Sequence, residues 1–201
     1  MPYEDVSGAQ VHSGWYKGWK NVREETLNAV RDMIWNHQPK TILITGHSLG
    51  GVLATFAAIE IKLHSGFLGY IALYTQGQPR MGNSQFADYV MTLFPNGEYN
   101  RVVHFTDPVP DQPSTLLGFK HAGNEIWYFS PLGSDFSHKE CVNKAGEQES
   151  HACSHTLFMR PFVEDHRNYL NEKISWLCNA YETPNLQVKI LALRKSAESA
   201  I

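Results

Sequence analysis

The chain has 201 residues, enough for one domain with a sizeable core and too few for two comfortable ones. Hydrophobic residues make up 42% of it and charged residues 18%, as in ordinary folded proteins. The formal net charge of −3 and the lack of a Lys/Arg block argue against a nucleic-acid binder. The sequence has no run of eighteen apolar residues, so no membrane-spanning helix is predicted. Residues 1–20 have neither a basic start nor an apolar run, so no signal peptide is visible.

Helical and strand patterns alternate along the chain. In chain order, the sequence predicts an irregular entry with aromatic anchors over 2–19, a helix over 22–37, a strand over 41–45, a helix over 52–63, a strand over 70–74, a helix over 84–93, strands over 101–105 and 125–129, and a terminal helix over 165–177. The short run TILIT at 41–45 is typical of a strand buried on both faces. The alternation predicts βαβ units and a mostly parallel sheet, in a single domain over 1–201 with residues 180–201 as an appendage.

The strongest chemical signal is the segment Gly46-His47-Ser48-Leu49-Gly50-Gly51, between a short strand and a long helix. A G-x-S-x-G sequence in that context predicts a sharp, strained turn that exposes the Ser48 hydroxyl as a nucleophile and needs small residues two positions before and after it. The following helix N-terminus favours negative charge, and the Leu49 N–H is then available as an oxyanion donor. The alternative is a glycine-rich turn in which Ser48 only caps the helix.

A serine nucleophile needs a base, and the base needs an orienting carboxylate, in the chain order Ser, acid, His for this kind of fold. Asp107 directly follows the strand RVVHFT and is the predicted acid. Asp111 lies further into a proline-rich loop, and Asp88 lies in a predicted helix. The alternative for Asp107 is a turn-forming role, since Asp-Pro commonly starts a turn.

The base must follow Asp107 in the chain. His166 is the predicted base, because it begins an amphipathic helix that can aim its ring at the serine. His12 and His104 precede the acid and are assigned structural roles. The remaining candidates lie in a turn or around a polar cysteine-containing loop: His121, His138, His151 and His155.

The three cysteines are Cys141, Cys153 and Cys178. Cys141 and Cys153 flank a short polar segment, which we expect to be a surface loop closed by a disulfide that contributes ~3 kcal/mol. Cys178 is then unpaired within the chain. The alternative is three reduced cysteines in a reducing compartment. The spacing of Cys and His gives no set of four zinc ligands, so no metal is predicted.

Six motifs in order along residues 3–178 resemble the class 3 lipases, the fungal triacylglycerol lipase-like family of α/β-hydrolases. These are Val11-His12-Ser13-Gly14-Trp15, the elbow Thr45 to Gly51, Gly77-Gln78-Pro79-Arg80-Met81-Gly82-Asn83, Asp107-Pro108-Val109-Pro110, His121-Ala122-Gly123-Asn124-Glu125-Ile126-Trp127, and Asp165-His166-Arg167-Asn168-Tyr169. The ordered set is far more specific than any single motif.

The resemblance implies an α/β-hydrolase-like fold with a mostly parallel central sheet flanked by helices, and a triad of Ser48, Asp107 and His166. It also implies a secreted enzyme that acts on lipid esters at a lipid–water interface without a cofactor. In the family, the first oxyanion donor lies on a loop after an earlier strand, and the lid helix follows that loop; both would fall before residue 1. The resemblance therefore implies that the N-terminal strands, the oxyanion loop and the lid are missing here. Family members often pair a C-terminal cysteine with an N-terminal one, which would account for Cys178.

Two functions of different classes follow from this sequence. The first is a carboxylic ester hydrolase of the triacylglycerol lipase type, working through an acyl-enzyme on Ser48; phospholipase A1 or a feruloyl-type esterase are variants of it. The second is a non-catalytic lipase-like binding module. The intact triad residues favour the enzyme, and the missing oxyanion loop favours the module. Oligomeric state and acyl-chain choice are not encoded in any motif of this sequence.

Overall fold

A computed structural model describes residues 1–3, 6–95, 97–131, 137–147, 149–156 and 163–174. Its centre is a five-stranded sheet with the strand order β1-β2-β4-β6-β7. The first four strands run parallel and β7 pairs antiparallel with β6. The strands are β1 (Thr41–His47), β2 (Tyr70–Gln76), β4 (Tyr99–His104), β6 (Asn124–Tyr128) and β7 (His138–Cys141). The mostly parallel sheet predicted from the alternating pattern is confirmed.

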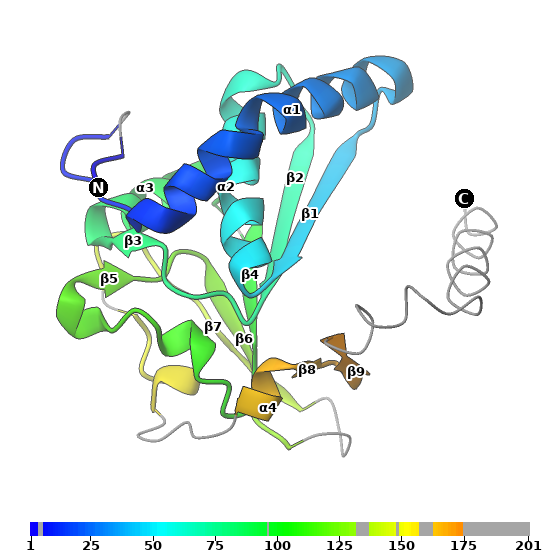
Figure 1. The fold of residues 1–201 in the computed structure, drawn as a ribbon. Helices are drawn as coiled ribbons and strands as arrows, with labels where there is room; N and C mark the ends of the chain where they lie inside the picture. The colour runs from blue at the N-terminus through cyan, green and yellow to red at the C-terminus, as the bar shows by residue number, and fades with distance from the viewer. Residues whose placement is uncertain (4–5, 96, 132–136, 148, 157–162, 175–201) are drawn as a thin grey trace.

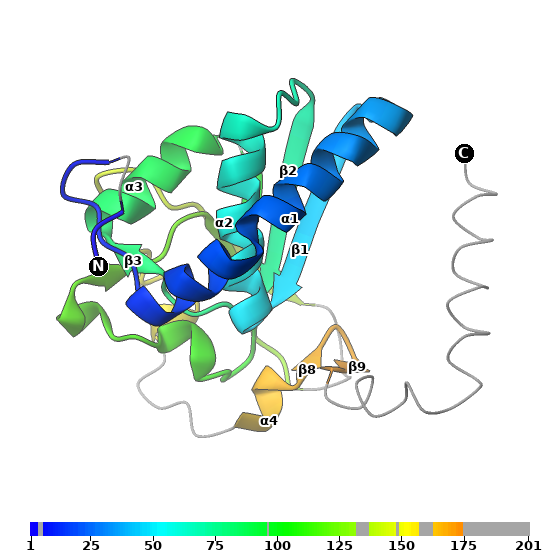
Figure 2. The same cartoon turned by 45° about the horizontal axis from the view of Figure 1, so that its top comes forward.

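In the described part of the chain, three long helices accompany the sheet: α1 (Ser13–His37), α2 (Leu49–His64) and α3 (Ser84–Leu93). Helix α2 packs against β1 and β2, and α1 crosses over α2 on the side away from the sheet (Figure 1). The same layering is visible after the molecule is turned (Figure 2). The described helices include none that is both long and apolar enough to cross a membrane.

Shorter elements connect and flank these layers. They are β3 (Gly82–Asn83), which pairs with β5 (Phe119–Lys120), the 3₁₀ turns η1 (Val109–Asp111), η2 (Thr115–Leu117) and η3 (Ser154–Thr156), the helix α4 (Val163–His166), and the hairpin of β8 (Asn168–Tyr169) and β9 (Glu172–Lys173). Helix α4 and the hairpin lie near the carboxyl ends of the parallel strands (Figure 1).

Helix α2 is the centre of the core. Val52, Ala58 and Ile59 are fully buried, as expected for a helix enclosed by a sheet on one side and a helix on the other. Phe56 of α2 contacts the rings of Tyr16 and Phe86, so the three helices meet in one aromatic cluster. Burial of such a ring contributes about 1.5–3 kcal/mol to stability.

The predicted irregular entry over 2–19 is wrong from residue 13 onward, because α1 already begins at Ser13. His12 acts as the N-cap, with its Nδ1 accepting a hydrogen bond from the Trp15 N–H (3.4 Å) and its ring stacked on that of Trp15. Tyr16 and Trp19, three residues apart, are on the buried side of the helix. The aromatic residues that we assigned to a loop are therefore helix packing residues.

The apolar run at 41–45 predicted a strand buried on both faces, and this prediction is wrong for β1. Its exposure alternates along the strand, and Leu43 is 65% exposed. In the described sheet β1 is an end strand, and α2 covers only one of its faces. An uninterrupted apolar run therefore does not distinguish a strand covered on two faces from one covered on a single face.

The terminal helix predicted for 165–177 is wrong over its described part. Helix α4 ends at His166, and residues 168–173 form the β8–β9 hairpin. Leu170 and Asn171, the two turn residues, have φ of 53° and 65°, a left-handed conformation that suits a two-residue hairpin and excludes a helix. Residues 175–177, the appendage 180–201 and Cys178 lie outside the described residues.

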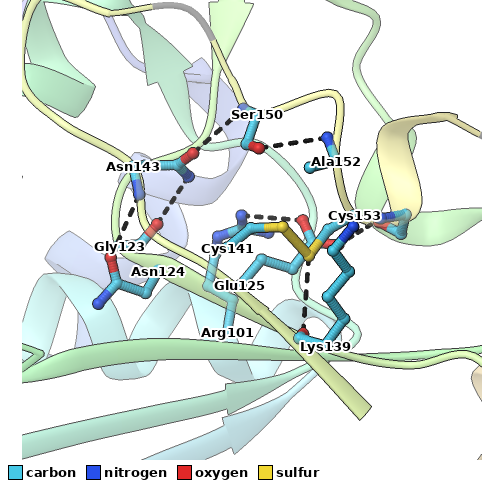
Figure 3. Close-up of a disulfide and its surroundings, with 11 residues drawn as sticks. Arg101, Gly123, Asn124, Glu125, Lys139, Cys141, Asn143, Ser150, Ala152 and Cys153 are labelled. Atoms are coloured by element: carbon cyan, nitrogen blue, oxygen red, sulfur yellow. Dashed lines mark hydrogen bonds and ion pairs between the residues drawn. A yellow bond between two sulfur atoms is a disulfide. The ribbon is translucent and has the colours of Figure 1, made fainter.

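A disulfide joins Cys141 at the end of β7 to Cys153, the pair expected from the sequence (Figure 3). Both cysteines are buried, with Cys153 fully buried and Cys141 5% exposed. Residues 142, 144–147, 151 and 152 between them are exposed, as expected for a surface loop. The Asn143 side chain donates to the Gly123 carbonyl (2.8 Å), and the Ser154 N–H donates to Glu125 Oε1 (2.9 Å). The disulfide therefore fixes a segment that also has its own hydrogen bonds to the sheet.

We predict that replacing both Cys141 and Cys153 by Ser lowers the free energy of unfolding by about 3 kcal/mol, because the cross-link constrains a short loop of the unfolded chain. Urea denaturation of the oxidised protein, measured beside the double variant, checks this. Reduction of the unsubstituted protein should reproduce the loss. A change below about 1 kcal/mol in both comparisons would mean that the surrounding hydrogen bonds hold the segment without the cross-link.

Candidate active site

Ser48 lies in a strained turn between β1 and α2. Its φ of 56° and ψ of −128° are outside the regions that L-residues favour, and its side chain makes no cap hydrogen bond to α2. The strain is held in place by the Ser48 N–H, which donates to the Gln76 carbonyl at the end of β2 (2.8 Å). The helix-cap alternative for Ser48 is therefore wrong, and the side chain is left for another partner.

The glycines around the turn differ in what they require. A Cβ on Gly46 would lie 2.3 Å from the Gly50 carbonyl oxygen, so only glycine fits there. A Cβ on Gly50 would meet nothing within 4 Å. The expectation of a small residue is met at Gly46, whose Cβ would collide with the main chain of Gly50. The same expectation is wrong at Gly50, because a Cβ there would lie in open space.

The structure brings Ser48, His166 and Asp107 together. The Ser48 hydroxyl lies 2.8 Å from His166 Nε2, and His166 Nδ1 lies 2.9 Å from Asp107 Oδ2 and 3.1 Å from Oδ1. A carboxylate only accepts, so Nδ1 carries the proton and Nε2 is left free to accept one from the serine. These three side chains come from positions 48, 107 and 166, and the geometry is that of a nucleophile, a base and an orienting acid.

The carboxylate of Asp107 is fully buried and is satisfied by several donors. Besides His166, the Val109 N–H donates to Oδ1 (2.8 Å) and the Tyr169 hydroxyl donates to Oδ2 (2.5 Å). Burial together with the adjacent Asp107 charge raises the pKa of Tyr169 well above 10, so this phenol remains a donor at any physiological pH. The Tyr169 oxygen in turn accepts from the His104 N–H (3.3 Å).

Asp165 fastens α4 to the loop that carries Asp107. Its Oδ2 accepts from both the N–H and the hydroxyl of Thr106, at 3.3 and 2.5 Å. Its carbonyl accepts from Nδ1 of His104 (3.2 Å), which is thus a structural residue as predicted. His166 and Asp107 are therefore carried on two segments that are themselves bonded to each other.

Gly77 lies beneath the triad with φ of 57°. A Cβ at this position would lie 2.8 Å from Asp107 Oδ2 and 2.9 Å from His166 Nδ1. Sequence reasoning assigned no site role to Gly77, Tyr169 or Asp165. Their positions within the G-x-P-R and D-H-x-x-Y motifs were the available signal, but their contacts to the triad depend on the tertiary structure.

The backbone N–H of Leu49 was the predicted oxyanion donor. Helix α2 begins at Leu49, so this N–H is one of the first groups of the helix, which have no intrahelical acceptor. The N-terminus of α2 also adds a partial positive charge beside Ser48. Its role as a donor stays a prediction.

The rival residues have other partners. Asp88 pairs with Lys120 (2.6 Å) and Asp111 with Arg80 (3.3 Å). His155 lies 3.6 Å from Asp111, and its ring lies tilted against that of His151, while His138 lies on β7 with its side chain 43% exposed. Among the described residues, the histidine that hydrogen-bonds to Ser48 is His166. The same part of the chain contains no group of three or more His, Cys, Asp or Glu placed to hold a metal ion.

His121 is a buried histidine in a charged surrounding. It is 3% exposed, and its ring Nε2–H donates to the Pro110 carbonyl (2.8 Å). Its main-chain N–H donates to Glu149 Oε1 (2.6 Å). Glu149 also binds Arg80 through two hydrogen bonds of 2.8 Å, which overcome the effect of burial and hold its pKa below the usual range. Burial, and next the charge of Arg101, lower the pKa of His121 well below 6.5, so this ring is neutral at pH 7.

Comparison with known proteins places the chain in a family. A family model described as lipase (class 3) matches residues 1–117, so the chain belongs to the class 3 lipases, as its motifs predicted. A lipase of Rhizomucor miehei is 35% identical over 171 residues, covering 84% of this chain and 45% of the relative. Secreted mono- and diacylglycerol lipase 1 of Fusarium solani is 38% identical over 136 residues, covering 67% of this chain and 39% of the relative. The chain therefore spans less than half the length of these curated relatives.

Solved structures agree with this assignment. Lipase II from Rhizopus niveus superposes with a TM-score of 0.77 at 30% identity, over 87% of this chain and 64% of that one. A structure described as a triacylglycerol lipase whose catalytic centre is formed by a serine protease triad gives a TM-score of 0.76 at 31% identity, over the same shares of the two chains. The fold is thus that of the α/β-hydrolase-like fungal lipases, which confirms the fold class predicted from the motifs.

We predict that the protein becomes less stable as the pH falls from 7 to 5, and that His121→Gln reduces this dependence. The folded state holds His121 neutral, whereas the unfolded chain protonates it near pH 6.5, so stability is lost as pH falls below that value. Urea denaturation at pH 7, 6 and 5 measures the effect. His37→Gln, at an exposed position of α1, is the control and should keep the original slope. Equal slopes in all three proteins would contradict a neutral buried His121.

Proposed function

We propose that this protein is a serine ester hydrolase of the lipase type. The observation that carries the proposal is the continuous set of hydrogen bonds from the Ser48 hydroxyl through His166 to the buried carboxylate of Asp107. Membership of the class 3 lipases supports it independently of the geometry. The reaction needs no metal or cofactor, because the side chains of the triad themselves provide the nucleophile and the proton transfers.

In the proposed reaction, Nε2 of His166 takes the proton of Ser48 as Oγ attacks the ester carbonyl. The resulting imidazolium donates that proton to the leaving alcohol, and the same residue then activates water to hydrolyse the acyl-enzyme. Asp107 stabilises the imidazolium and fixes its orientation. The Leu49 N–H and the α2 N-terminus face the developing oxyanion, where preorganised donors are most effective.

The substrate class is lipid esters, acylglycerols foremost. The family relationship supports this choice, since the matched relatives are named lipase or mono- and diacylglycerol lipase. One of those relatives is named as secreted, and the buried disulfide of this chain fits an oxidising compartment. We therefore propose an extracellular enzyme that meets its substrate at a lipid–water interface.

Ser48→Ala and His166→Ala should each lower ester turnover by roughly 10⁴–10⁶-fold, because the members of a triad act as a unit. Hydrolysis of soluble p-nitrophenyl esters and of emulsified acylglycerols measures this. His155→Ala is the matched control and should keep most of the activity, since that ring contacts Asp111 and His151 instead. Covalent labelling of Ser48 by a serine-reactive phosphonate gives a second measure. A protein that neither turns over esters nor reacts at Ser48 would be a non-catalytic module.

Gly77→Ala should lower kcat by about 10²-fold or more, because the added Cβ displaces Asp107 and His166, and a displacement of about 1 Å costs that much in rate. Gly66→Ala is the matched control: Gly66 has a similar positive φ of 78°, but its Cβ would meet nothing within 4 Å. The control separates backbone strain from displacement of the triad. If both variants lose equal activity and equal stability, contact with the triad is not the cause.

A further inference from the structure

The carbonyl of His166 lies at the end of a very short helix. Helix α4 has four residues, and His166 is its last, so this carbonyl has no donor within the helix. It accepts a hydrogen bond from Nε2–H of His47 (2.8 Å). His47 is the last residue of β1 and directly precedes Ser48. The residue beside the nucleophile therefore binds the main chain of the residue that carries the base.

The two histidine rings also lie against each other. Their centroids are 4.5 Å apart, and the ring of His47 meets that of Tyr169 edge to face at 5.4 Å. His47 thus contacts both the base and the phenol that donates to Asp107. Burial, partly offset by the hydrogen bond to the His166 carbonyl, lowers the pKa of His47, so the ring is a neutral donor at pH 7.

Helix α4 is attached to the sheet in two directions. Asp165 links it to Thr106 and His104, at the end of β4, which carries the acid. The bond from His47 links it to β1, which carries the nucleophile. The first attachment fixes the base relative to the acid, and the second fixes it relative to the serine. These are separate requirements, since Ser48 and Asp107 follow different strands.

We propose that His47 is a positioning residue, whose side-chain N–H holds the main-chain carbonyl of His166 and thereby sets the distance between Ser48 Oγ and His166 Nε2. The inference rests on the proposed function, and it assigns a role to a motif residue that the triad itself does not use. A neutral donor suits the position, because His166 becomes a cation during acyl transfer and a second cation 4.5 Å away would oppose that charge.

The test compares His47→Leu, which removes the donor, with His47→Gln, whose side-chain amide can place an N–H near the position of Nε2. His47→Leu should lower kcat about 10–100-fold with KM changed less than about threefold, since the lost contact acts on orientation and not on substrate binding. His47→Gln should recover most of that loss. His64→Leu is the control for a histidine replaced at a half-exposed site and should keep the full kcat.

Two further measurements keep this inference distinct from the proposed function. The rate at which a phosphonate labels Ser48 should fall in His47→Leu and recover in His47→Gln, even if no natural ester is turned over. The downfield proton resonance of His166 Nδ1–H, bonded to Asp107, should persist in both variants, because the Asp165 attachment remains. Equal labelling rates in the unsubstituted protein and His47→Leu, or equal losses in the Leu and Gln variants, would overturn the positioning role. If the unsubstituted protein fails to label at all, the proposed function fails. Loss of the Nδ1 resonance in His47→Leu would show that His47 also fixes His166 relative to Asp107, and would contradict the assignment of that role to Asp165 alone.

Discussion

The buried carboxylate of Asp107 is the constraint on which the candidate site depends. A fully buried charge is unfavourable unless donors surround it, and here the donors come from residue 109 beside Asp107 and from the distant residues 166–169. They are the main chain of Val109, the imidazole of His166 and the hydroxyl of Tyr169. The loop after β4, helix α4 and strand β8 must all be in place before this one group is satisfied. The site is therefore complete only when the last described segment, residues 163–174, is in place.

The strained backbone of Ser48 depends on the same sheet. The turn is held by the hydrogen bond from Ser48 to the end of β2, and by the close approach of Gly46 to the main chain of residue 50. Strain of this kind persists only where surrounding contacts over-determine it. Parallel strands place the ends of β1, β2 and β4 at one edge, so Ser48, Gly77 and Asp107 lie together although they are far apart in the chain.

A second set of buried polar groups supports the loop that follows the acid. Arg80 donates to the Asp111 and Pro113 carbonyls and binds Glu149 through two hydrogen bonds. Arg101 donates to the Ala122 carbonyl and pairs with Glu125, which accepts from Ser154 next to the disulfide. Removing one partner from such a buried pair leaves an uncompensated charge, which is strongly destabilising. The disulfide and the loop after Asp107 are thus both held by hydrogen bonds to these two buried ion pairs.

The sequence by itself determined the features that depend on neighbouring residues. The elbow around Ser48, the helices over 52–63 and 84–93 and the mostly parallel pairing of the strands all follow from local periodicity and turn chemistry. The positions of Asp107 and His166 followed from their order after Ser48 and from the family motifs. The tertiary structure decided the rest. The exposure of Leu43 depends on which face of β1 is covered by α2. The hairpin after His166 replaces a helix because the hydroxyl of Tyr169 bonds to the carboxylate of Asp107, 62 positions away. Likewise, Gly77 must be glycine because two side chains from distant segments meet above it. Such requirements arise between segments that are far apart in the sequence, and no local pattern of residues encodes them.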